Sequence, residues 1–443
     1  MPSVNDPVNR PRILVAGGGY VGLYVALRLQ KKVAAAGGIV TVVDPMPYMT
    51  YRPFLPEVAG GNLEGRHVTV PLHRTLRKAE FIQGSVVAVD HSGRRATVQL
   101  PGNEGTIEVR YVDIVMAAGA TTRIFPIPGL AEKSVGIRTL EEAVALRSQV
   151  LERIEFASTA VDPAMRETAL TFVVVGGGIG GIETLTEIED LARSAIVTSA
   201  SVKQEEARFV LVEAMARIMP EVTAEQAKWV VEHLRSRGIE VLLNTSLASV
   251  EGSTLKLISL PGRTPAQELE ADTLIWTAGA QPNPVVRSTD LPFEPRGRVR
   301  VLPDLRVAGD EGIVENAWAA GDIAAVPDLT GNGLPDGTCV PNAQHALRQA
   351  KLLARNLWAS RRGYPLQDYK HKNLGVVAGF GRWKGVANIN LVGHIGLTGP
   401  LAWLTHRGYH GLAIPTMESK ALVGLNLVSI LLAGRATNAR RPR

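Results

Sequence analysis

Short apolar runs that end at glycine-rich turns recur along this chain and predict its architecture. Residues 12–16, RILVA, form an apolar run that meets three glycines at 17–19, and apolar side chains then fall at helical spacing over 21–29. The run VTVVD at 40–44 predicts a further strand. The order strand, tight turn, helix, strand indicates an α/β fold.

The first turn contains a G-x-G-x-x-G pattern made by Gly17, Gly19 and Gly22. These glycines allow the tight turn, the close approach of the backbone to a pyrophosphate, and close packing of the helix. The phosphates then lie at a helix N-terminus, where free N–H groups and the helix dipole favour an anion. Asp44 ends the following strand, where its carboxylate can accept hydrogen bonds from ribose hydroxyls. The alternative is a structural turn that binds no ligand.

The same order recurs in TFVVVGGGIGGIETL, in which Gly176, Gly178 and Gly181 form a second pattern, and in the strand RFVLVE, which ends at Glu213. Two dinucleotide-binding folds are therefore predicted in one chain. A carboxylate at Glu213 bonds a free 2′-hydroxyl and repels a 2′-phosphate, so NADH is expected over NADPH. Arg217 lies nearby, either as a solvated loop arginine or as a partner for such a phosphate.

The composition of the chain excludes several kinds of catalytic site. The chain has 443 residues, 45% of them hydrophobic and 20% charged, which is a globular composition long enough for about three domains. Cys339 is its only cysteine, which excludes an intramolecular disulfide framework, a Cys-x-x-Cys redox pair and a cysteine-clustered metal site. We expect no metal site, and a packing role for Cys339 instead of a nucleophilic one.

The two ends of the chain bear on its location. The first residues, MPSVNDPVNRPR, contain no apolar run, so we expect no secretory signal and a catalytic part in the cytoplasm. Near the other end Ala421–Gly434 is free of charge, but its 14 residues fall short of the roughly 20 that span a bilayer. Residues 401–443 supply +5 of the net charge of +6, so the basic character points to a membrane surface, with no nucleic acid expected.

Further segments carry a family resemblance that covers nearly the whole chain. The chain resembles the type II NADH:quinone oxidoreductases, within the FAD-dependent pyridine nucleotide-disulfide oxidoreductase superfamily. The resemblance implies that the first glycine pattern binds FAD and the second binds NADH. The segments that carry it are VAGGGYVGL, MTYRPFLPEVAGG, IVMAAGATTR, VVVGGGIGGIE, LIWTAGAQPNP, AWAAGDIA and PNAQHALRQAK.

The resemblance also assigns cofactor contacts. In AWAAGDIA it implies that Gly321 and Asp322 hold the ribityl and pyrophosphate part of the flavin. IVMAAGA and LIWTAGA look like paired crossover strands, in which small residues such as Ala118 and Gly279 let the chain pass beside the nucleotides. The alternative for AWAAGDIA is a plain turn at the end of a strand.

Three residues match the family's catalytic positions. Glu183 matches a glutamate that faces the nicotinamide, although it is equally placed as an acid that complements a helix dipole. Gln344 matches the quinone-associated A-Q-x-A-x-Q segment, in which Arg348 departs from the pattern. Lys372 matches a lysine near flavin and quinone, with Asn373 in place of the usual glycine. Ordinary helix packing and an exposed loop lysine are the alternatives for these two.

We therefore expect two Rossmann-like domains in a glutathione-reductase-like arrangement, followed by a C-terminal amphipathic helical membrane module. The expected bounds are 1–135 with 285–375 for FAD, 136–284 for NADH and 376–443 for membrane association. The last helix places its polar side chains on one narrow face and apolar side chains over the rest. A core helix or a homodimer interface is the alternative. The polar residues are Ser419, Asn426 and Ser429.

The expected activity is hydride transfer from NADH to FAD, followed by transfer of two electrons to a membrane quinone, menaquinone or ubiquinone, without proton pumping. The early region has no cysteine pair of the kind that disulfide reductases use, so electrons should pass directly from flavin to acceptor. The rivals are a soluble NAD(P)H:acceptor reductase of the ferredoxin type and a flavin-binding regulatory protein without turnover. We expect the enzyme at the cytoplasmic face of the cell membrane.

Overall fold

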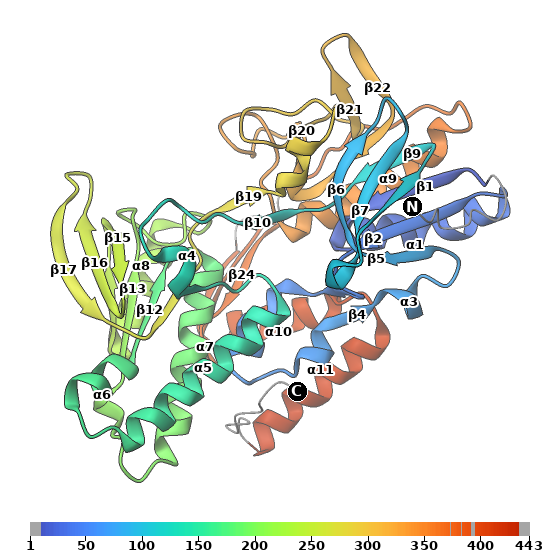
Figure 1. The fold of residues 1–443 in the computed structure, drawn as a ribbon. Helices are drawn as coiled ribbons and strands as arrows, with labels where there is room; N and C mark the ends of the chain where they lie inside the picture. The colour runs from blue at the N-terminus through green and yellow to red at the C-terminus, as the bar shows by residue number, and fades with distance from the viewer. Residues whose placement is uncertain (1–9, 373, 382, 391–394, 434–443) are drawn as a thin grey trace. The chain divides into compact units, whose positions relative to one another are not determined.

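A computed structural model describes the backbone of residues 10–372, 374–381, 383–390 and 395–433, and the side chains of these except 103 and 427–433 (Figure 1). The chain forms two compact units, each assembled from separated segments. Unit 1 comprises Met1–Met49, Val70–Thr121 and Ala280–Asn373, and unit 2 comprises Thr50–Thr69, Thr122–Gly279 and Leu374–Arg443. The functional bounds expected for the FAD, NADH and membrane-association regions stay a prediction.

A six-stranded sheet is the centre of unit 1, in the order β21-β22-β9-β1-β2-β5. All neighbouring strands are parallel except β21, which runs antiparallel to β22. The inner strands β1 and β9 are apolar after their first residues, Arg12 and Asp113, because both of their faces are covered. The strands are β1 (Arg12–Ala16), β2 (Ile39–Asp44), β5 (Glu80–Gln83), β9 (Asp113–Met116), β21 (Arg306–Gly309) and β22 (Gly312–Ala319).

Helix α1 (Tyr20–Ala35) follows β1, and α9 (Ala343–Ser360) packs beside it. Helix α1 continues past the predicted residues 21–29 because Gln30 and Val33 also face the core. The remaining elements of unit 1 are α3 (Leu72–Thr75), the meander β6 (Ser85–Asp90), β7 (Arg95–Gln99) and β8 (Thr106–Arg110), and the short β19 (Ala280–Pro282), β20 (Val299–Arg300) and β23 (Ala324–Ala325). Short strands at unit boundaries are β3 (Tyr48–Thr50), β4 (Thr69–Pro71) and β10 (Ala120–Thr122).

Unit 2 contains a second sheet, wholly parallel, in the order β11-β18-β12-β13-β14. Its strands are β11 (Ser134–Val135), β12 (Thr171–Val175), β13 (Arg208–Val212), β14 (Ile239–Leu242) and β18 (Thr273–Trp276). The helices around it are α2 (Leu55–Ala59), α4 (Leu130–Lys133), α5 (Leu140–Thr159), α6 (Pro163–Ala169), α7 (Ile179–Val197) and α8 (Ala224–Ser236). Capping boxes at Thr139 and Thr223 begin α5 and α8.

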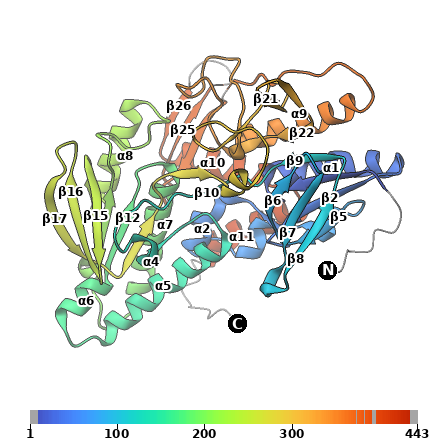
Figure 2. The same ribbon diagram turned by 45° about the horizontal axis from the view of Figure 1, so that its top comes forward.

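Two meanders and a helix pair complete unit 2. The first meander is β15 (Thr245–Glu251), β16 (Thr254–Ser259) and β17 (Thr264–Glu270), seen together in Figure 2. The second is β24 (Gly375–Gly379), β25 (Gly385–Ile389) and β26 (Ile395–Thr398). Helices α10 (Pro400–Ala413) and α11 (Met417–Ala433) end the described chain. Among the helices described, none combines the length and the apolar character needed to cross a bilayer.

The segments IVMAAGA and LIWTAGA each begin in a sheet and end at a crossover strand, since β10 and β19 start at Ala120 and Ala280 and pair with each other. Their apolar halves are β9 and β18, which are inner strands of the two parallel sheets, with all four residues of each buried. Strands covered on both faces are mostly apolar, so the apolar half of each segment belongs to a sheet and only its end belongs to the crossover. The small residues that follow these strands carry the chain from each sheet to its crossover strand.

Candidate functional site

The first glycine turn, in unit 1, is closed at Gly17 and Gly22 and open at Gly19. Gly17 has a φ of +112°, and a Cβ there would lie 2.5 Å from the Ala117 carbonyl oxygen. A Cβ on Gly22 would lie 1.7 Å from the Gly17 carbonyl oxygen, so only glycine lets α1 start this close to the turn. Around the Cβ position of Gly19, in contrast, there is no atom within 4 Å. This open side at the N-terminus of α1 fits a pyrophosphate.

The carboxylate of Asp44 fixes the turn from the next strand. Its Oδ2 accepts a hydrogen bond from the Gly18 N–H at 2.7 Å, and its Oδ1 accepts one from the Met46 N–H at 2.9 Å. The carboxylate therefore lies beside the glycine turn, as a contact to a ribose bound there requires.

Gly321 and Asp322 lie in unit 1 beside the start of α1. They belong to a 3₁₀ turn, Gly321–Ile323, that directly follows β22. A Cβ on Gly321 would lie 2.8 Å from Val21 Cγ2, and its N–H donates to Gln349 Oε1 at 2.8 Å. Ala118 also borders the first turn, because a Cβ on Gly17 would lie 2.9 Å from its Cα. The structure thus brings these predicted residues together around one helix N-terminus.

The second glycine turn, in unit 2, repeats this construction. Gly176 has a φ of +119°, and a Cβ on Gly181 would lie 2.0 Å from the Gly176 carbonyl oxygen. No atom lies within 4 Å of the Cβ position of Gly178. Glu213 Oε2 accepts a hydrogen bond from the Gly177 N–H at 2.5 Å, as Asp44 does in the first turn. Its residues therefore fit a second dinucleotide.

Arg217 and Gly279 lie in unit 2, after β13 and β18. Arg217 is exposed. Its guanidinium donates hydrogen bonds to two carbonyl oxygens of its own loop, those of Val222 at 3.2 Å and Pro220 at 3.3 Å. Gly279 follows β18 with a φ of +84°, a backbone conformation that favours glycine.

Gln344 and Lys372 lie in unit 1, at the start of α9 and after its end. Gln344 is half-buried in the first turn of α9, and Lys372 is exposed. His371 links the two regions, since its Nε2 lies 3.4 Å from Gln344 Oε1. Asn373, the departure noted beside Lys372, lies outside the described residues. Arg348 donates to the Gln344 carbonyl oxygen at 2.9 Å, one turn along the same helix.

Cys339 is buried in the core of unit 1. Burial, with a smaller contribution from the charge of Asp328, raises the pKa of its thiol to about 11. The thiolate, which is the nucleophilic form, is therefore disfavoured at neutral pH. In the described part of the chain, no group of three His, Cys, Asp or Glu side chains is placed to hold a metal ion.

Glu183 lies in unit 2, in α7, and is buried against β24 and α10. Its Oε1 accepts the Gly379 N–H at 3.0 Å and lies 3.3 Å from His406 Nε2. Burial raises the pKa of Glu183 to about 8, against the opposing effects of the Gly379 hydrogen bond and Arg407. Burial lowers the pKa of His406 to about 3, so a protonated glutamic acid faces a neutral imidazole at pH 7. The Glu183 carboxyl thus keeps its proton to a higher pH than an exposed glutamic acid does.

A second buried carboxyl lies close to this group and was not predicted. Arg407 in α10 reaches both Glu57 Oε1 and Glu187 Oε1, each at 3.3 Å. Glu187 also accepts a hydrogen bond from Asn62. Burial raises the pKa of Glu57 to about 8, and Arg407 only partly opposes the shift. One buried guanidinium therefore contacts two buried carboxyl groups. Of these, Glu57 holds a proton at neutral pH.

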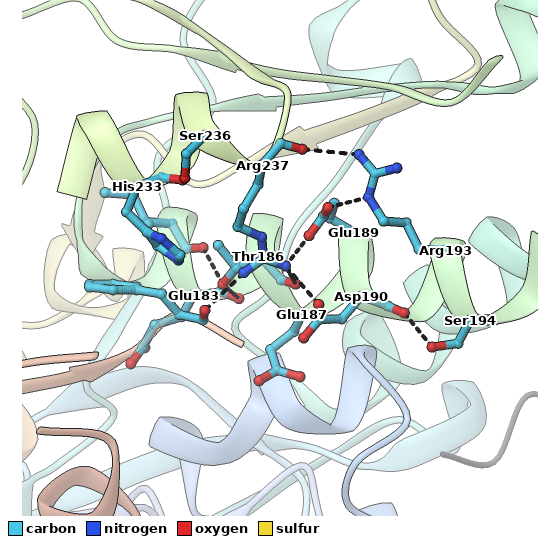
Figure 3. A network of polar contacts seen from close by, with 12 residues as sticks. Glu183, Thr186, Glu187, Glu189, Asp190, Arg193, Ser194, His233, Ser236 and Arg237 are labelled. Carbon is cyan, nitrogen blue, oxygen red and sulfur yellow. Dashed lines mark hydrogen bonds and ion pairs between the residues drawn. The ribbon is translucent and has the colours of Figure 1, made fainter. Parts of the chain in front are cut away.

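The acidic residues of α7 continue on its next turns, as Figure 3 shows. Arg237 forms ion pairs with Glu189 and with Asp190, the latter at 2.7 Å. Arg193 pairs with Glu189 and donates to the Arg237 carbonyl oxygen at 3.1 Å. The signal that sequence inspection missed is an apolar helix with acids at positions 183, 187 and 190, which lie three or four residues apart and so share one helix face.

Comparisons with known proteins agree with this construction. The family profile of the pyridine nucleotide-disulphide oxidoreductases matches residues 11–350. The type II NADH:quinone oxidoreductase Ndh of Mycobacterium tuberculosis is 27% identical over 416 residues, which are 91% of this chain and 85% of that protein. The demethylphylloquinone reductase NdbB of a Synechocystis species is 28% identical over 425 residues, which are 94% of this chain and 95% of the relative. The resemblance stated from the sequence is confirmed.

The fold also matches a solved structure. The structure of NDH2 from Plasmodium falciparum in complex with NADH superposes with a TM-score of 0.88, at 18% identity, over 97% of this chain and 100% of that one. At that identity the match describes the fold alone, an α/β dinucleotide-binding fold. Since the family profile spans most of the chain, including both glycine turns, the chain belongs to the pyridine nucleotide-disulphide oxidoreductase family.

Proposed function

We propose that this protein is a type II NADH:quinone oxidoreductase, which oxidises NADH through bound FAD and reduces a quinone without pumping protons. One observation carries the proposal: two glycine turns of the same construction, each closed by a carboxylate from the next strand, occur in a chain with a single buried cysteine. Two dinucleotides and no thiol pair favour direct transfer from flavin to acceptor. The names of the relatives from Mycobacterium tuberculosis and Synechocystis support a quinone as that acceptor.

The chain's residues have separate tasks in this proposal. Gly17, Gly19 and Gly22 admit the pyrophosphate of FAD, and Asp44 bonds its ribose. Asp322 lies beside the same helix start, where it bonds the ribityl and pyrophosphate region. FAD, when bound, supplies the two-electron chemistry by accepting hydride and passing electrons on. NADH and one proton are consumed, and the quinone gains two electrons and two protons.

In unit 2 the proposed tasks are binding NADH and holding a proton. Gly176, Gly178 and Gly181 admit the pyrophosphate of NADH, and Glu213 bonds its adenosine ribose. Glu183 carries a proton at neutral pH because burial raises its pKa. We assign it to the nicotinamide side of the reaction.

Quinone binding is assigned to Gln344 and Lys372 in unit 1. The support is the link through His371, whose Nε2 lies 3.4 Å from Gln344 Oε1 and which directly precedes Lys372. A side-chain amide and an ammonium group can both donate hydrogen bonds to quinone carbonyl oxygens. Menaquinone and ubiquinone both present such oxygens.

The activity is tested by anaerobic stopped-flow spectroscopy on the flavin-loaded protein. NADH should bleach the flavin absorption, and a water-soluble menaquinone or ubiquinone analogue should restore it within the turnover time. A Gln344→Ala variant should be bleached at the wild-type rate and reoxidised more slowly. A protein that contains no flavin, or whose reduced flavin is reoxidised by dioxygen or ferredoxin but not by quinone, contradicts the proposal.

Membrane association through α10 and α11 is the second part of the proposal. The polar stripe of α11 faces unit 2: Ser419 Oγ donates to the Thr69 carbonyl oxygen at 3.3 Å, and Asn426 Nδ2 donates to the Asn62 carbonyl oxygen at 2.8 Å. Ser429, the third predicted member, lies outside the described side chains. Because the polar side chains of α11 face the rest of unit 2, apolar side chains are left on the outer surface of the two helices. The exposed apolar residues are Leu401, Leu404, Leu412, Met417 and Leu425.

A surface of this kind fits one leaflet of a bilayer, where a lipid-soluble quinone is concentrated. The test is flotation of the full-length protein with liposomes, compared with a Leu412→Glu/Leu425→Glu variant. The variant should lose most of the flotation and keep NADH oxidation with a water-soluble quinone. If the wild type is instead a homodimer that the two glutamates split, without any change in flotation, α10 and α11 form a subunit interface.

A further inference from the structure

Helices α1 and α9, which pack side by side in unit 1, are both basic and contain no acidic residue (Figure 1). Surface helices ordinarily mix the two signs, because like charges three or four residues apart destabilise a helix. Two neighbouring helices that both lack acids therefore need an explanation. The basic residues are Arg28, Lys31 and Lys32 in α1, and Arg348, Lys351 and Arg355 in α9.

Five of these six side chains line one open cavity of about 560 Å³: Arg28, Lys32, Arg348, Lys351 and Arg355. Residues 28 and 32 lie one helical turn apart, and residues 348, 351 and 355 also follow one face of their helix. The two stripes converge on the same cavity, whose other lining residues are Leu352 and Ala354. The cavity therefore carries five positive charges and no negative one.

No carboxylate of the described residues forms an ion pair with any of these five side chains. Lys32 Nζ lies over the Trp358 ring, 6.0 Å from its centroid, and Arg348 donates to the Gln344 carbonyl oxygen. The pKa of Lys351 is lowered by partial burial and by the charges of Arg28 and Arg348. The cations are thus close enough to repel one another, and an anion placed among them would relieve the repulsion.

The cavity lies apart from the dinucleotide turn of the same unit. Arg28 stands nine residues beyond Gly19 along α1, which corresponds to about 13 Å at the rise of an α-helix. The pyrophosphate of a dinucleotide lies at the helix start and leaves the second and third turns free. Arg348 stands where the family pattern has glutamine, and it is one of the five cations that line this cavity.

We propose that this cavity is a second anion site, which binds a ligand carrying two or more phosphate groups. Guanidinium groups grip phosphate oxygens in pairs, and ammonium groups add point charges. A single phosphate carries at most about two charges at neutral pH, so five cations leave room for a ligand with more than one phosphate group. The volume is within the range of about 300 to 1,000 Å³ that small ligands occupy. The source is either a soluble polyphosphate or an anionic phospholipid.

The test is calorimetric titration of the full-length, flavin-loaded protein with sodium tripolyphosphate, in the presence of saturating NAD⁺ so that the second dinucleotide turn is filled. Arg28→Ala and Lys351→Ala should each weaken binding by about tenfold or more, since each removes charged hydrogen bonds to phosphate. Lys31→Ala is the matched control, because this exposed lysine of the same helix does not line the cavity. It should change the affinity by less than about twofold. The flavin spectrum and thermal midpoint of each variant report intact folding.

A second arm identifies the source. Liposomes of phosphatidylcholine with and without cardiolipin, whose headgroup carries two phosphates, are mixed with the same variants. If Lys351→Ala lowers cardiolipin-dependent binding and Lys31→Ala does not, the phosphates belong to lipid; if only tripolyphosphate binding responds, they belong to a soluble ligand. Absence of both effects overturns the proposal, and so does equal weakening by Lys31→Ala, which would indicate a diffuse surface charge. Both readouts are binding measurements, so they stand or fall independently of quinone reduction.

Discussion

At the scale of single residues, the second and third glycines of the NADH turn differ in what surrounds them. The Cβ of Gly178→Ala would meet no protein atom within 4 Å, and its φ of −73° and ψ of 173° suit any residue. The added methyl group would instead enter the space assigned to the pyrophosphate. We predict that Gly178→Ala folds, keeps FAD, and raises the KM for NADH by about tenfold, measured by steady-state kinetics.

Gly181→Ala is the contrasting variant at the same turn. Its Cβ would lie 2.0 Å from the Gly176 carbonyl oxygen, an overlap that a shift of α7 must relieve. Overlap in a packed region costs about 1 to 3 kcal/mol or more, so a lower thermal midpoint should accompany the loss of NADH binding. Equal stability of the two variants would show that the third glycine is not required by helix packing.

The proton on Glu57 predicts a specific dependence of stability on pH. Its pKa is about 8 in the folded protein and near 4.5 in the unfolded chain, because burial penalises the charged form. A carboxyl with a raised folded pKa stabilises the fold fully below the unfolded value, and this contribution is lost as pH rises through the folded value. Between pH 7 and 8 the free energy of unfolding should fall by about 1 kcal/mol on account of Glu57.

Glu57→Gln removes that titration and keeps the shape of the side chain. The variant should lose about 1 kcal/mol less than the wild type between pH 7 and 8 in denaturant unfolding. Glu205→Gln, at an exposed position of the same unit, is the matched control and should follow the wild type. Identical pH profiles for all three proteins would show that Glu57 is already ionised at pH 7. His406 does not enter this window, since its pKa is lowered in the fold and its unfolded value of 6.5 lies below pH 7.

Sequence inspection identified the residues with a local pattern and missed those defined by tertiary contacts. Glycine spacing and a strand-terminal acid predicted both turns with their carboxylates. The buried pair formed by Glu57 and Arg407 joins residues 350 positions apart, and no local spacing marks it. Such a contact exists only once packing has brought α2 and α10 together, so no stretch of the sequence marks it.

At the scale of elements, α11 is held by its polar stripe. Asn426 donates to the Asn62 carbonyl oxygen at 2.8 Å, and its Oδ1 lies 3.0 Å from His67 Nδ1. Each such bond contributes about 0.5 to 1.5 kcal/mol. We predict that Asn426→Ala loosens the helix and speeds hydrogen exchange of its amides, measured by mass spectrometry on peptides covering residues 417–426.

Leu425→Ala is the control within the same helix, because Leu425 is 68% exposed and makes little contact with the protein. Its exchange in the absence of lipid should match the wild type. In the presence of liposomes the amides of Leu425→Ala should exchange faster than those of the wild type, because the variant loses the protection that lipid gives. If Asn426→Ala exchanges like the wild type, apolar contacts of Val423, which is buried, hold the helix instead.

The elements also show where hydrophobic patterning is ambiguous. Strand β18 is buried at all four positions, so its sequence carries no alternation that would separate a central strand from a linking one. Helix α1 was predicted too short because Gln30, a polar residue, is buried and bonds the Lys78 N–H at 2.9 Å. Polar residues that are satisfied inside the core break the apolar pattern without ending the helix.

The fold class of the whole molecule could be predicted because the sequence pattern of a dinucleotide-binding fold is local and occurs twice. Each dinucleotide-binding fold is marked by an apolar strand, a glycine turn and an acidic residue within one short segment. The assembly of each unit from separated segments is different, because it depends on which surfaces bury one another. Residues 50–69 and 374–443 group with unit 2 through contacts of α2, α7 and α10, which no sequence period encodes.

The proposed route of electrons from flavin to quinone uses no thiol. Members of this family that reduce disulfides need a redox-active pair, whereas Cys339 is alone, buried in unit 1, and has a pKa raised to about 11. If flavin passes electrons directly to quinone, Cys339→Ala should keep NADH:quinone turnover within about twofold, with a loss of stability of about 1 kcal/mol for the small cavity. Steady-state assays with a water-soluble quinone, before and after treatment with iodoacetamide, measure this directly. A wild type that alkylation inactivates, together with an inactive Cys339→Ala that still holds FAD and is still bleached by NADH, would place the thiol on the path from flavin to acceptor.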